Sequence, residues 1–163
     1  MEDVANHEYF MRQALNEAKK AANLGEVPIG AIVVLNEDIV ASAYNKVEGL
    51  KNPTAHAEIL AIRRACASLK NKYLINATIY VTIEPCAMCT WALILSRIGY
   101  LVYGAEDKRT GACGGILDLV NRSKLNHKIK VTRGVLASEC QALIQNFFRN
   151  LRIRSTKENR KYI

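Results

Sequence analysis

Apolar residues recur along the chain at two spacings, one typical of helices and one typical of strands. Over residues 7–24 they follow helical spacing and end before Gly25, which predicts an amphipathic first helix. The runs 29–35 and 39–44 have strand-like composition, and residues 36–38 between them (Asn-Glu-Asp) are typical of a turn. The pattern predicts a helix followed by a β-hairpin.

The rest of the chain alternates between the two spacings. In chain order we expect a helix over 55–69, a strand over 78–83, a helix over 86–97, a strand over 100–103, a glycine-rich loop over 104–115, a strand over 129–135 and a helix over 138–154. This order predicts an α/β fold of three layers, α/β/α, around a central mixed sheet of about five strands. Strands joined by a crossover helix should run parallel.

Composition narrows the class of protein. The chain has 163 residues, which favours one domain over 1–163, and 50% of them are hydrophobic, which is enough for a core and excludes general disorder. No apolar run is long enough to span a membrane, and the opening Met1-Glu2-Asp3 does not resemble a secretory signal, so we expect a cytoplasmic protein. In that setting five cysteines indicate metal ligation or burial and not a disulfide framework.

The positive charge is concentrated at the C-terminal end. The formal net charge is +8, and residues 149–163 carry +5 of it, from six basic side chains and the single acid Glu158. The six are Arg149, Arg152, Arg154, Lys157, Arg160 and Lys161. Such a basic helix end and tail favours a polyanionic partner such as a nucleic acid. A solvated basic helix end is the alternative interpretation.

Two short segments carry candidate chemistry, and each follows a proline-containing turn and should open a helix. They are His56-Ala57-Glu58 and Pro85-Cys86-Ala87-Met88-Cys89. Cys86 and Cys89 are three residues apart, so their sulfurs lie on one side of a helix and suit a tetrahedral zinc. His56 would be a further metal ligand, and Glu58 would stand beside the open metal position without binding the metal.

The number of ligands decides the kind of site. A structural zinc has four protein ligands, whereas a catalytic zinc keeps three and one open position. His56, Cys86 and Cys89 make three, and Cys113 in the glycine-rich loop is the candidate fourth. A CxxC pair alone is often two buried hydrophobes and a single histidine is often structural, but the two segments together indicate a catalytic zinc, with Glu58 as proton acceptor.

These motifs and longer matches resemble the cytidine deaminase-like superfamily, and within it the bacterial tRNA-specific adenosine deaminases. The matching segments are 26–31 (Glu-Val-Pro-Ile-Gly-Ala), Asn45, 53–58, 82–89, 96–99, Tyr103-Gly104-Ala105, Asp107, Asn126-His127 and Phe147-Phe148-Arg149. The resemblance implies one zinc ion per subunit and hydrolytic deamination of adenosine to inosine at the wobble position of a tRNA anticodon, that of tRNA-Arg with anticodon ACG. Attack would occur at C6 of adenine, with Glu58 moving the proton.

The same resemblance implies a substrate-binding set. Its members are Val27, Asn45, Ala57, Asp107, Phe148, Arg149 and Arg152. Asn45 would hydrogen-bond the flipped nucleotide and the N–H of Ala57 would hold the attacking oxygen, while a turn residue is the alternative for Asn45. Asp107 would accept a ribose 2′-hydroxyl or cap its loop. Phe148 would stack on a base or pack at the edge of the core, with Phe147 in the core.

Two residues depart from the family pattern, Asn52 where aspartate is common and Arg109 where lysine is frequent. Both bear on loop and RNA contacts and leave the zinc ligands untouched. The partners implied are a tRNA anticodon stem-loop and a second copy of the chain. The apolar third helix, with Trp91, Leu93, Ile94 and Leu95, would lie in a homodimer interface or pack against its own sheet.

Two other functions fit the motifs. One is a deaminase of free bases or nucleotides, such as guanine or cytosine, although such an enzyme has no use for a strongly basic tail. The other is a non-catalytic zinc-stabilised RNA-binding module in which Cys113 closes the metal shell, which leaves Glu58 without a role. Cys66, Cys113 and Cys140 are otherwise expected to be small buried hydrophobes.

Overall fold

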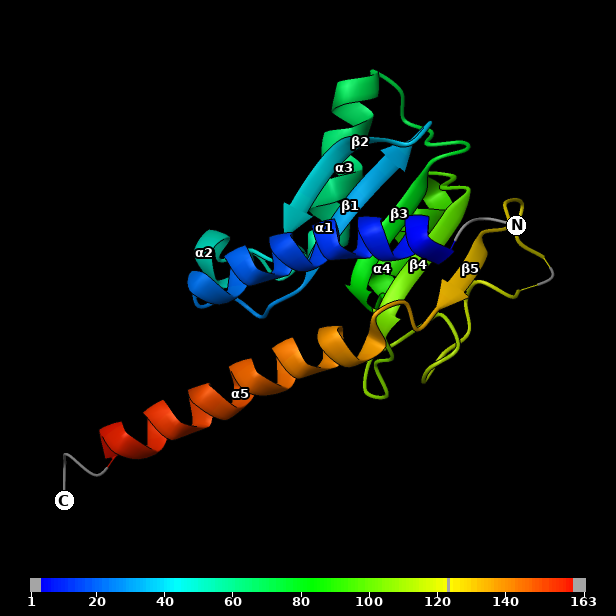
Figure 1. Cartoon of the computed structure of the whole chain (residues 1–163). Coiled ribbons are helices and arrows are strands. Elements are labelled where there is room, and N and C mark those ends of the chain that lie inside the picture. The colour runs from blue at the N-terminus through cyan, green and yellow to red at the C-terminus, as the bar shows by residue number, and fades with distance from the viewer. Residues whose placement is uncertain (1–3, 123, 160–163) are drawn as a thin grey trace.

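The computed structural model describes residues 4–122 and 124–159 and contains a five-stranded sheet with helices on both faces (Figure 1). The helices are α1 (Val4–Asn23), α2 (Val47–Leu50), α3 (Ala57–Leu69), α4 (Ala87–Leu95) and α5 (Ala137–Asn159). The strands are β1 (Gly30–Leu35), β2 (Asp38–Tyr44), β3 (Thr78–Ile83), β4 (Tyr100–Ala105) and β5 (Lys130–Arg133). The three-layer mixed α/β architecture predicted from the pattern is confirmed.

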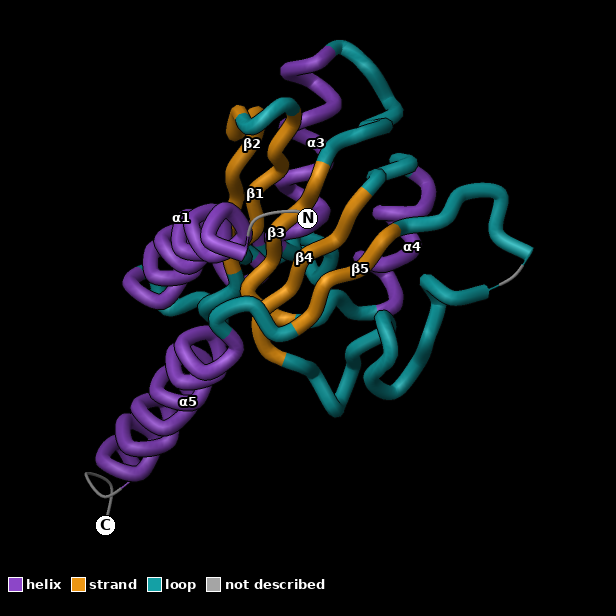
Figure 2. Tube along the Cα trace, turned by 45° about the vertical axis from the view of Figure 1, so that its right-hand side comes forward, coloured by secondary structure: helices purple, strands orange, loops and turns teal. Residues whose placement is uncertain are grey.

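The strand order across the sheet is β2-β1-β3-β4-β5 (Figure 2). β1 pairs antiparallel with both β2 and β3, and the hairpin turn places Asn36 and Glu37 at positive φ. β4 pairs parallel with β3, as the intervening helix α4 predicts. β5 also pairs parallel with β4, although the long connection after Ala105 has no helix in its described residues.

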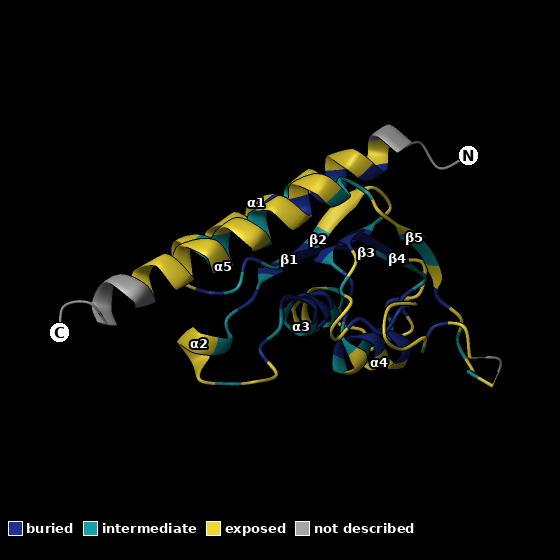
Figure 3. Ribbon diagram, turned by 90° about the horizontal axis from the view of Figure 1, so that it is seen from below, coloured by how far each residue is buried: buried dark blue, intermediate teal, exposed yellow. Residues whose placement is uncertain are grey.

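Alternate residues of the central strands face opposite layers. Ile79 and Val81 of β3 pack with α3 and α4, whereas Tyr80 between them packs with α1 and α5. Figure 3 shows the sheet between these two helical layers, with α3 and α4 on one side and α1 and α5 on the other. Because both faces are covered, β1 and β3 are almost continuously buried, and apolar residues do not alternate with exposed polar ones along them.

The first helix lies unusually close to the sheet. A Cβ on Gly30 would be 2.0 Å from the carbonyl oxygen of Ala14, so any larger residue at the start of β1 would displace α1. An ion pair between Arg12 and Glu139, 3.0 Å from Nη1 to Oε2, also links α1 to α5. These contacts hold α1 and α5 on the face of the sheet opposite the two candidate motifs.

The predicted core position of Phe147 in the last helix is wrong. Cys140 is buried and Leu143 packs against the core, but Leu151 is 49% exposed and Phe147 is half-buried. α5 runs past the edge of the sheet as a projecting arm (Figure 1), so its apolar stripe meets no strand there. Within the described residues no helix is long and apolar enough to cross a membrane.

Candidate metal centre and its surroundings

The two motifs stand at the starts of neighbouring helices on one face of the sheet. His56 is the N-cap residue of α3 and Cys86 is the N-cap residue of α4, each with extended backbone angles, and α3 contacts α4. Neither side chain caps its own helix. Both are therefore available to a common ligand at a place where helix dipoles favour thiolates.

His56, Cys86 and Cys89 form a compact cluster whose ligand atoms all lie within 4.8 Å of one another. His56 Nδ1 is 3.7 Å from Cys86 Sγ and 3.5 Å from Cys89 Sγ. Tetrahedral zinc with ordinary Zn–S and Zn–N bond lengths would separate a nitrogen and a sulfur ligand by about 3.6 Å. The donor set and its spacing therefore fit zinc.

The cluster has three ligands and not four among the described residues. Cys113 is buried outside it, where its Sγ is 3.3 Å from Thr90 Oγ1. The glycine-rich loop does approach the cluster. Gly111 forms an isolated antiparallel β-bridge with Cys86, and Ala112 N donates a hydrogen bond to Pro85 O. Three ligands and an open position are the arrangement of a catalytic zinc.

Hydrogen bonding polarises the two thiols. The Cys89 thiol donates to Cys86 and, against the effect of burial, lowers the pKa of Cys86 to about 4. The same hydrogen bond and burial raise the pKa of Cys89. The hydrogen bond with Cys86 also raises the pKa of His56, although burial opposes it.

Glu58 lies in the first turn of α3 beside this cluster and is 3% exposed. Burial raises the pKa of its carboxyl group, while its own backbone N–H and the charge of His56 act in the opposite direction. Its Oε2 is buried with no hydrogen-bond partner among the described residues. A buried acid with an unpaired oxygen next to an open metal position fits a group that exchanges a proton with a bound substrate.

Three more of the predicted substrate residues are buried or half-buried. Ala57 is the first residue of α3 and is fully buried. It lies directly between His56 and Glu58 in the sequence. Asn45 follows the last residue of β2, is 4% exposed, and donates from Nδ2 to Glu26. Val27 is half-buried, and its carbonyl oxygen accepts from Ile29 N at 2.8 Å.

Asp107 lies in the loop after β4, and both its oxygens accept hydrogen bonds from that loop. Oδ1 accepts from the N–H groups of Arg109 and Thr110, and Oδ2 accepts from the Thr110 hydroxyl at 2.5 Å. Burial would raise the Asp107 pKa, but these hydrogen bonds outweigh it and the net shift is downward. The contacts match the loop-capping interpretation, and binding of a 2′-hydroxyl by Asp107 stays a prediction.

The other predicted residues lie on the projecting part of α5. Phe148 is 40% exposed and meets Phe147 edge-to-face at 5.4 Å between ring centroids. Phe148, Arg149 and Arg152 line a groove of about 560 Å³ whose other wall includes Arg109. The structure thus brings the basic helix to the loop of Asp107, and none of the three metal ligands lines this groove. Arg160 and Lys161 of the predicted tail lie outside the described residues.

Two buried acids were missed by the sequence interpretation. Glu84 is 1% exposed and accepts from the backbone N–H groups of Asp107, Cys113 and Gly115, at 3.1, 2.9 and 2.8 Å. Glu26 is 3% exposed and binds the segment after β2 in a similar way. The available signal was an acid beside an apolar run, one or two residues before a matched proline.

Comparison with known proteins agrees with this geometry. A family profile described as MafB19-like deaminase matches residues 5–152, so the chain is a member of that deaminase family. A tRNA-specific adenosine deaminase of Aquifex aeolicus is 47% identical over 145 residues, which cover 89% of this chain and 95% of that protein. One of Bacillus subtilis is 46% identical over 145 residues, covering 89% and 90%. Within the deaminases, the chain belongs to the tRNA-specific adenosine deaminase family.

Solved structures show the same fold. One, from a study of A-to-I editing by tRNA:A34 deaminases at the wobble position, has a TM-score of 0.80 and 40% identity, covering 83% of this chain and 98% of its own. A guanine deaminase of Nitrosomonas europaea is more distant, with a TM-score of 0.72 and 26% identity, covering 86% and 83%. Similarity to the tRNA enzymes is therefore greater than to this free-base enzyme in both sequence and structure.

Proposed function

We propose that the protein hydrolyses adenosine to inosine and ammonia at the wobble position of a tRNA anticodon, with tRNA-Arg (ACG) as substrate and one zinc ion per subunit. The observation that carries the proposal is the three-ligand cluster of His56, Cys86 and Cys89 beside the unpaired Oε2 of Glu58. Similarity to tRNA-specific adenosine deaminases supports the substrate. A tRNA substrate also supports a cytoplasmic location.

The chemistry divides between the metal and the chain's own groups. Zinc, when bound, supplies the Lewis acidity that activates water for attack at C6 of adenine. Glu58 would take the two protons of the attacking water at Oε2 in turn, and would deliver the first to the ring nitrogen and the second to the departing amine, which leaves as ammonia. Burial, which raises the pKa of Glu58, suits a group that is protonated and deprotonated within one reaction cycle.

Binding of the nucleotide falls to residues around the centre. Val27, Asn45 and Ala57 line the approach to the target base, and the N–H of Ala57 holds the attacking oxygen. Asp107, Phe148, Arg149 and Arg152 contact the surrounding anticodon loop, with the two arginines on phosphates and the phenyl ring on an unstacked base. The groove shared by α5 and Arg109 supports this assignment.

A homodimer is the assembly that we propose. Leu93 and Ile94 of α4 are buried against the chain's own core, but Trp91 and Leu95 on the same helix are 47% and 64% exposed. A second copy of the chain would cover this apolar surface. Trp91→Glu should convert a dimer to a monomer in sedimentation experiments, and an unchanged mass would refute this interface.

The decisive test is incubation of the zinc-loaded protein with an arginine tRNA transcript carrying the anticodon ACG. Sequencing should then read the wobble adenosine as guanosine. The same transcript incubated without the protein is the control, and free guanine and cytosine are tested in parallel. Deamination of a free base with no inosine in the tRNA would overturn the proposal in favour of a free-base enzyme.

A further inference from the structure

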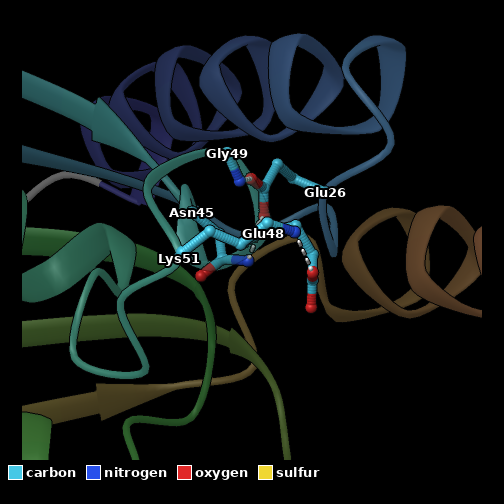
Figure 4. Close-up of polar contacts among 5 residues, drawn as sticks. All are labelled: Glu26, Asn45, Glu48, Gly49 and Lys51. Atoms are coloured by element: carbon cyan, nitrogen blue, oxygen red, sulfur yellow. Dashed lines mark hydrogen bonds and ion pairs between the residues drawn. The ribbon is translucent and has the colours of Figure 1, made fainter.

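Glu26 is a buried acid that the reaction outlined above does not use. It lies between α1 and β1, and its carboxylate oxygens accept three hydrogen bonds from the segment that follows β2 (Figure 4). Oε1 accepts from Gly49 N at 2.6 Å, and Oε2 accepts from Glu48 N at 3.1 Å and from Asn45 Nδ2 at 3.3 Å. One side chain therefore holds both a backbone turn and a predicted substrate residue.

The two hydrogen bonds from backbone N–H groups to Glu26 stabilise the short helix α2. Its N-cap residue Lys46 makes no side-chain capping bond, and the free N–H groups of the first turn go to Glu26 instead. A Cβ on Gly49 would lie 3.2 Å from Oε1, so the carboxylate sits directly against the turn. α2 is thus capped by an acid that lies more than twenty residues earlier in the chain.

The side-chain part fixes the orientation of the Asn45 amide. A carboxylate only accepts hydrogen bonds, so Asn45 must present its NH₂ group to Glu26, and its Oδ1 points away from that contact. The next residue, Lys46, donates from its backbone N to Ala55 O at 3.0 Å, directly before His56. Asn45 is therefore held by its own hydrogen bond to Glu26 and, through the backbone of Lys46, by the segment that ends at His56.

We infer that Glu26 is a positioning residue, which orients Asn45 so that its Oδ1 accepts a hydrogen bond from the target nucleotide. This inference rests on the proposed function. An oriented acceptor favours a nucleotide that offers a donor and disfavours a phosphate or carbonyl at the same place. An internal adenosine in RNA carries two kinds of donor, the exocyclic amine and the ribose 2′-hydroxyl.

A double-mutant cycle tests the inference. In E26Q an NH₂ group replaces one of the two accepting oxygens and faces other donors, so the Asn45 amide turns over or loses its restraint. Both E26Q and N45A should lower kcat/KM on an anticodon stem-loop by about tenfold or more. The double variant should be no more than about twofold worse than N45A alone, because Glu26 acts through Asn45.

The matched control is E48Q, since the Glu48 side chain is exposed on the same short helix and pairs only with Lys51, at 3.4 Å, in the contacts of the described chain. It should keep the wild-type kcat/KM. All variants should retain the wild-type zinc content and thermal midpoint within a few degrees. Multiplicative losses for E26Q and N45A would show that Glu26 acts independently of Asn45 and would overturn the inference.

A stem-loop with 2′-deoxyadenosine at the target position identifies the donor. If the wild type loses activity on it and N45A does not, the hydroxyl is the partner of Oδ1; if both lose activity equally, the amine is. In either case E26Q must respond like N45A. An E26Q enzyme that responds like the wild type, while N45A does not, would contradict the inference.

One measurement is independent of catalysis. The Asn45 side-chain NH₂ resonances, assigned by their loss in N45A, should exchange slowly with solvent in the wild type and rapidly in E26Q. Unprotected Asn45 resonances in the wild type would refute the Glu26 contact even in an active enzyme. A protein that produces no inosine but protects these resonances would refute the proposed function and leave the positioning contact standing.

Discussion

The candidate metal centre and the projecting end of α5 differ in how far their side chains are exposed to water. At the centre, Glu58 is 3% exposed, and every ligand is fixed by a helix start that packs on the sheet. On α5, Phe148 is 40% exposed, and Arg149 donates from Nη2 to Asn146 Oδ1 of its own helix at 2.8 Å. The first region buries its acid, and the second leaves its arginines exposed.

This difference predicts a division of labour. Groups in a buried, preorganised site act on the chemical step, because their interactions are strong and directional there. Exposed arginines act through counterion release, so they change the affinity for the nucleic acid and the dependence of that affinity on salt concentration. Substitutions in the two regions should therefore change different measurable quantities.

Removing a metal ligand should have the largest effect. We expect Cys89→Ala to lose zinc and all measurable deamination, because two remaining ligands do not hold the ion in a tetrahedral site. Metal content by mass spectrometry and inosine by sequencing are the measurements. Cys66→Ser is the matched control, since Cys66 is half-buried at the other end of α3 and should keep both. Zinc retained in full by the Cys89 variant would contradict the assignment.

Removing the proton acceptor should affect the chemical step alone. Glu58→Gln keeps the size of the side chain but cannot take a proton, so kcat should fall by about 10²- to 10⁴-fold. Zinc content and the Kd for the stem-loop should stay at the wild-type values. A Kd that changes as much as kcat would mean that Glu58 serves mainly in binding.

Neutralising the arm should affect binding alone. We expect the double variant Arg149→Gln, Arg152→Gln to weaken the Kd for tRNA by about tenfold and to reduce the slope of log K against log salt by about 1 to 2, with kcat unchanged. The exposed pair Lys19→Gln, Arg63→Gln removes the same charge elsewhere and should leave the slope unaltered. Equal slopes for all three proteins would refute a role of the arm in phosphate binding.

The loop between the two regions should show the smallest effect. Since hydrogen bonds lower the Asp107 pKa below its ordinary value, the ionised group stabilises the fold above that value. This contribution is lost as the pH falls through the lowered pKa. Asp107→Asn should therefore unfold with less dependence on pH in the acid range, measured by circular dichroism. An unchanged acid profile would show that the capping contacts do not contribute to folding.

The spacing of residues predicted that His56, Cys86 and Cys89 lie close together, because their geometry is local. His56 and Cys86 each begin a helix, and Cys86 and Cys89 share one helical turn, so the motif and the periodicity together indicated the cluster. The alternation of apolar residues similarly predicted the hairpin and the parallel pairing of β3 with β4.

What the sequence could not show depends on distant backbone groups. Glu26 and Glu84 bind N–H groups of loops that lie 19 to 31 residues away, and no side-chain pattern marks such partners. α2 lies between the predicted elements 39–44 and 55–69, where the pattern predicts no helix, because its four residues are held by Glu26 and not by their own propensity. The exposure of Leu151 arises where α5 passes the edge of the sheet, which periodicity alone does not reveal.

The parallel pairing of β4 and β5 has a consequence for how this fold can vary. A parallel pair is commonly joined by a helix that packs on the sheet, and its length is then fixed by that packing. Here the connection after Ala105 has no such helix in its described residues. Glu84 anchors its beginning, and His127, whose Nε2 is 2.6 Å from Ile98 O, anchors it near its end, while the ladder from Tyr100–Lys130 to Tyr103–Arg133 holds the strand. Insertions between these two anchors can therefore change the surface of the protein without moving the sheet.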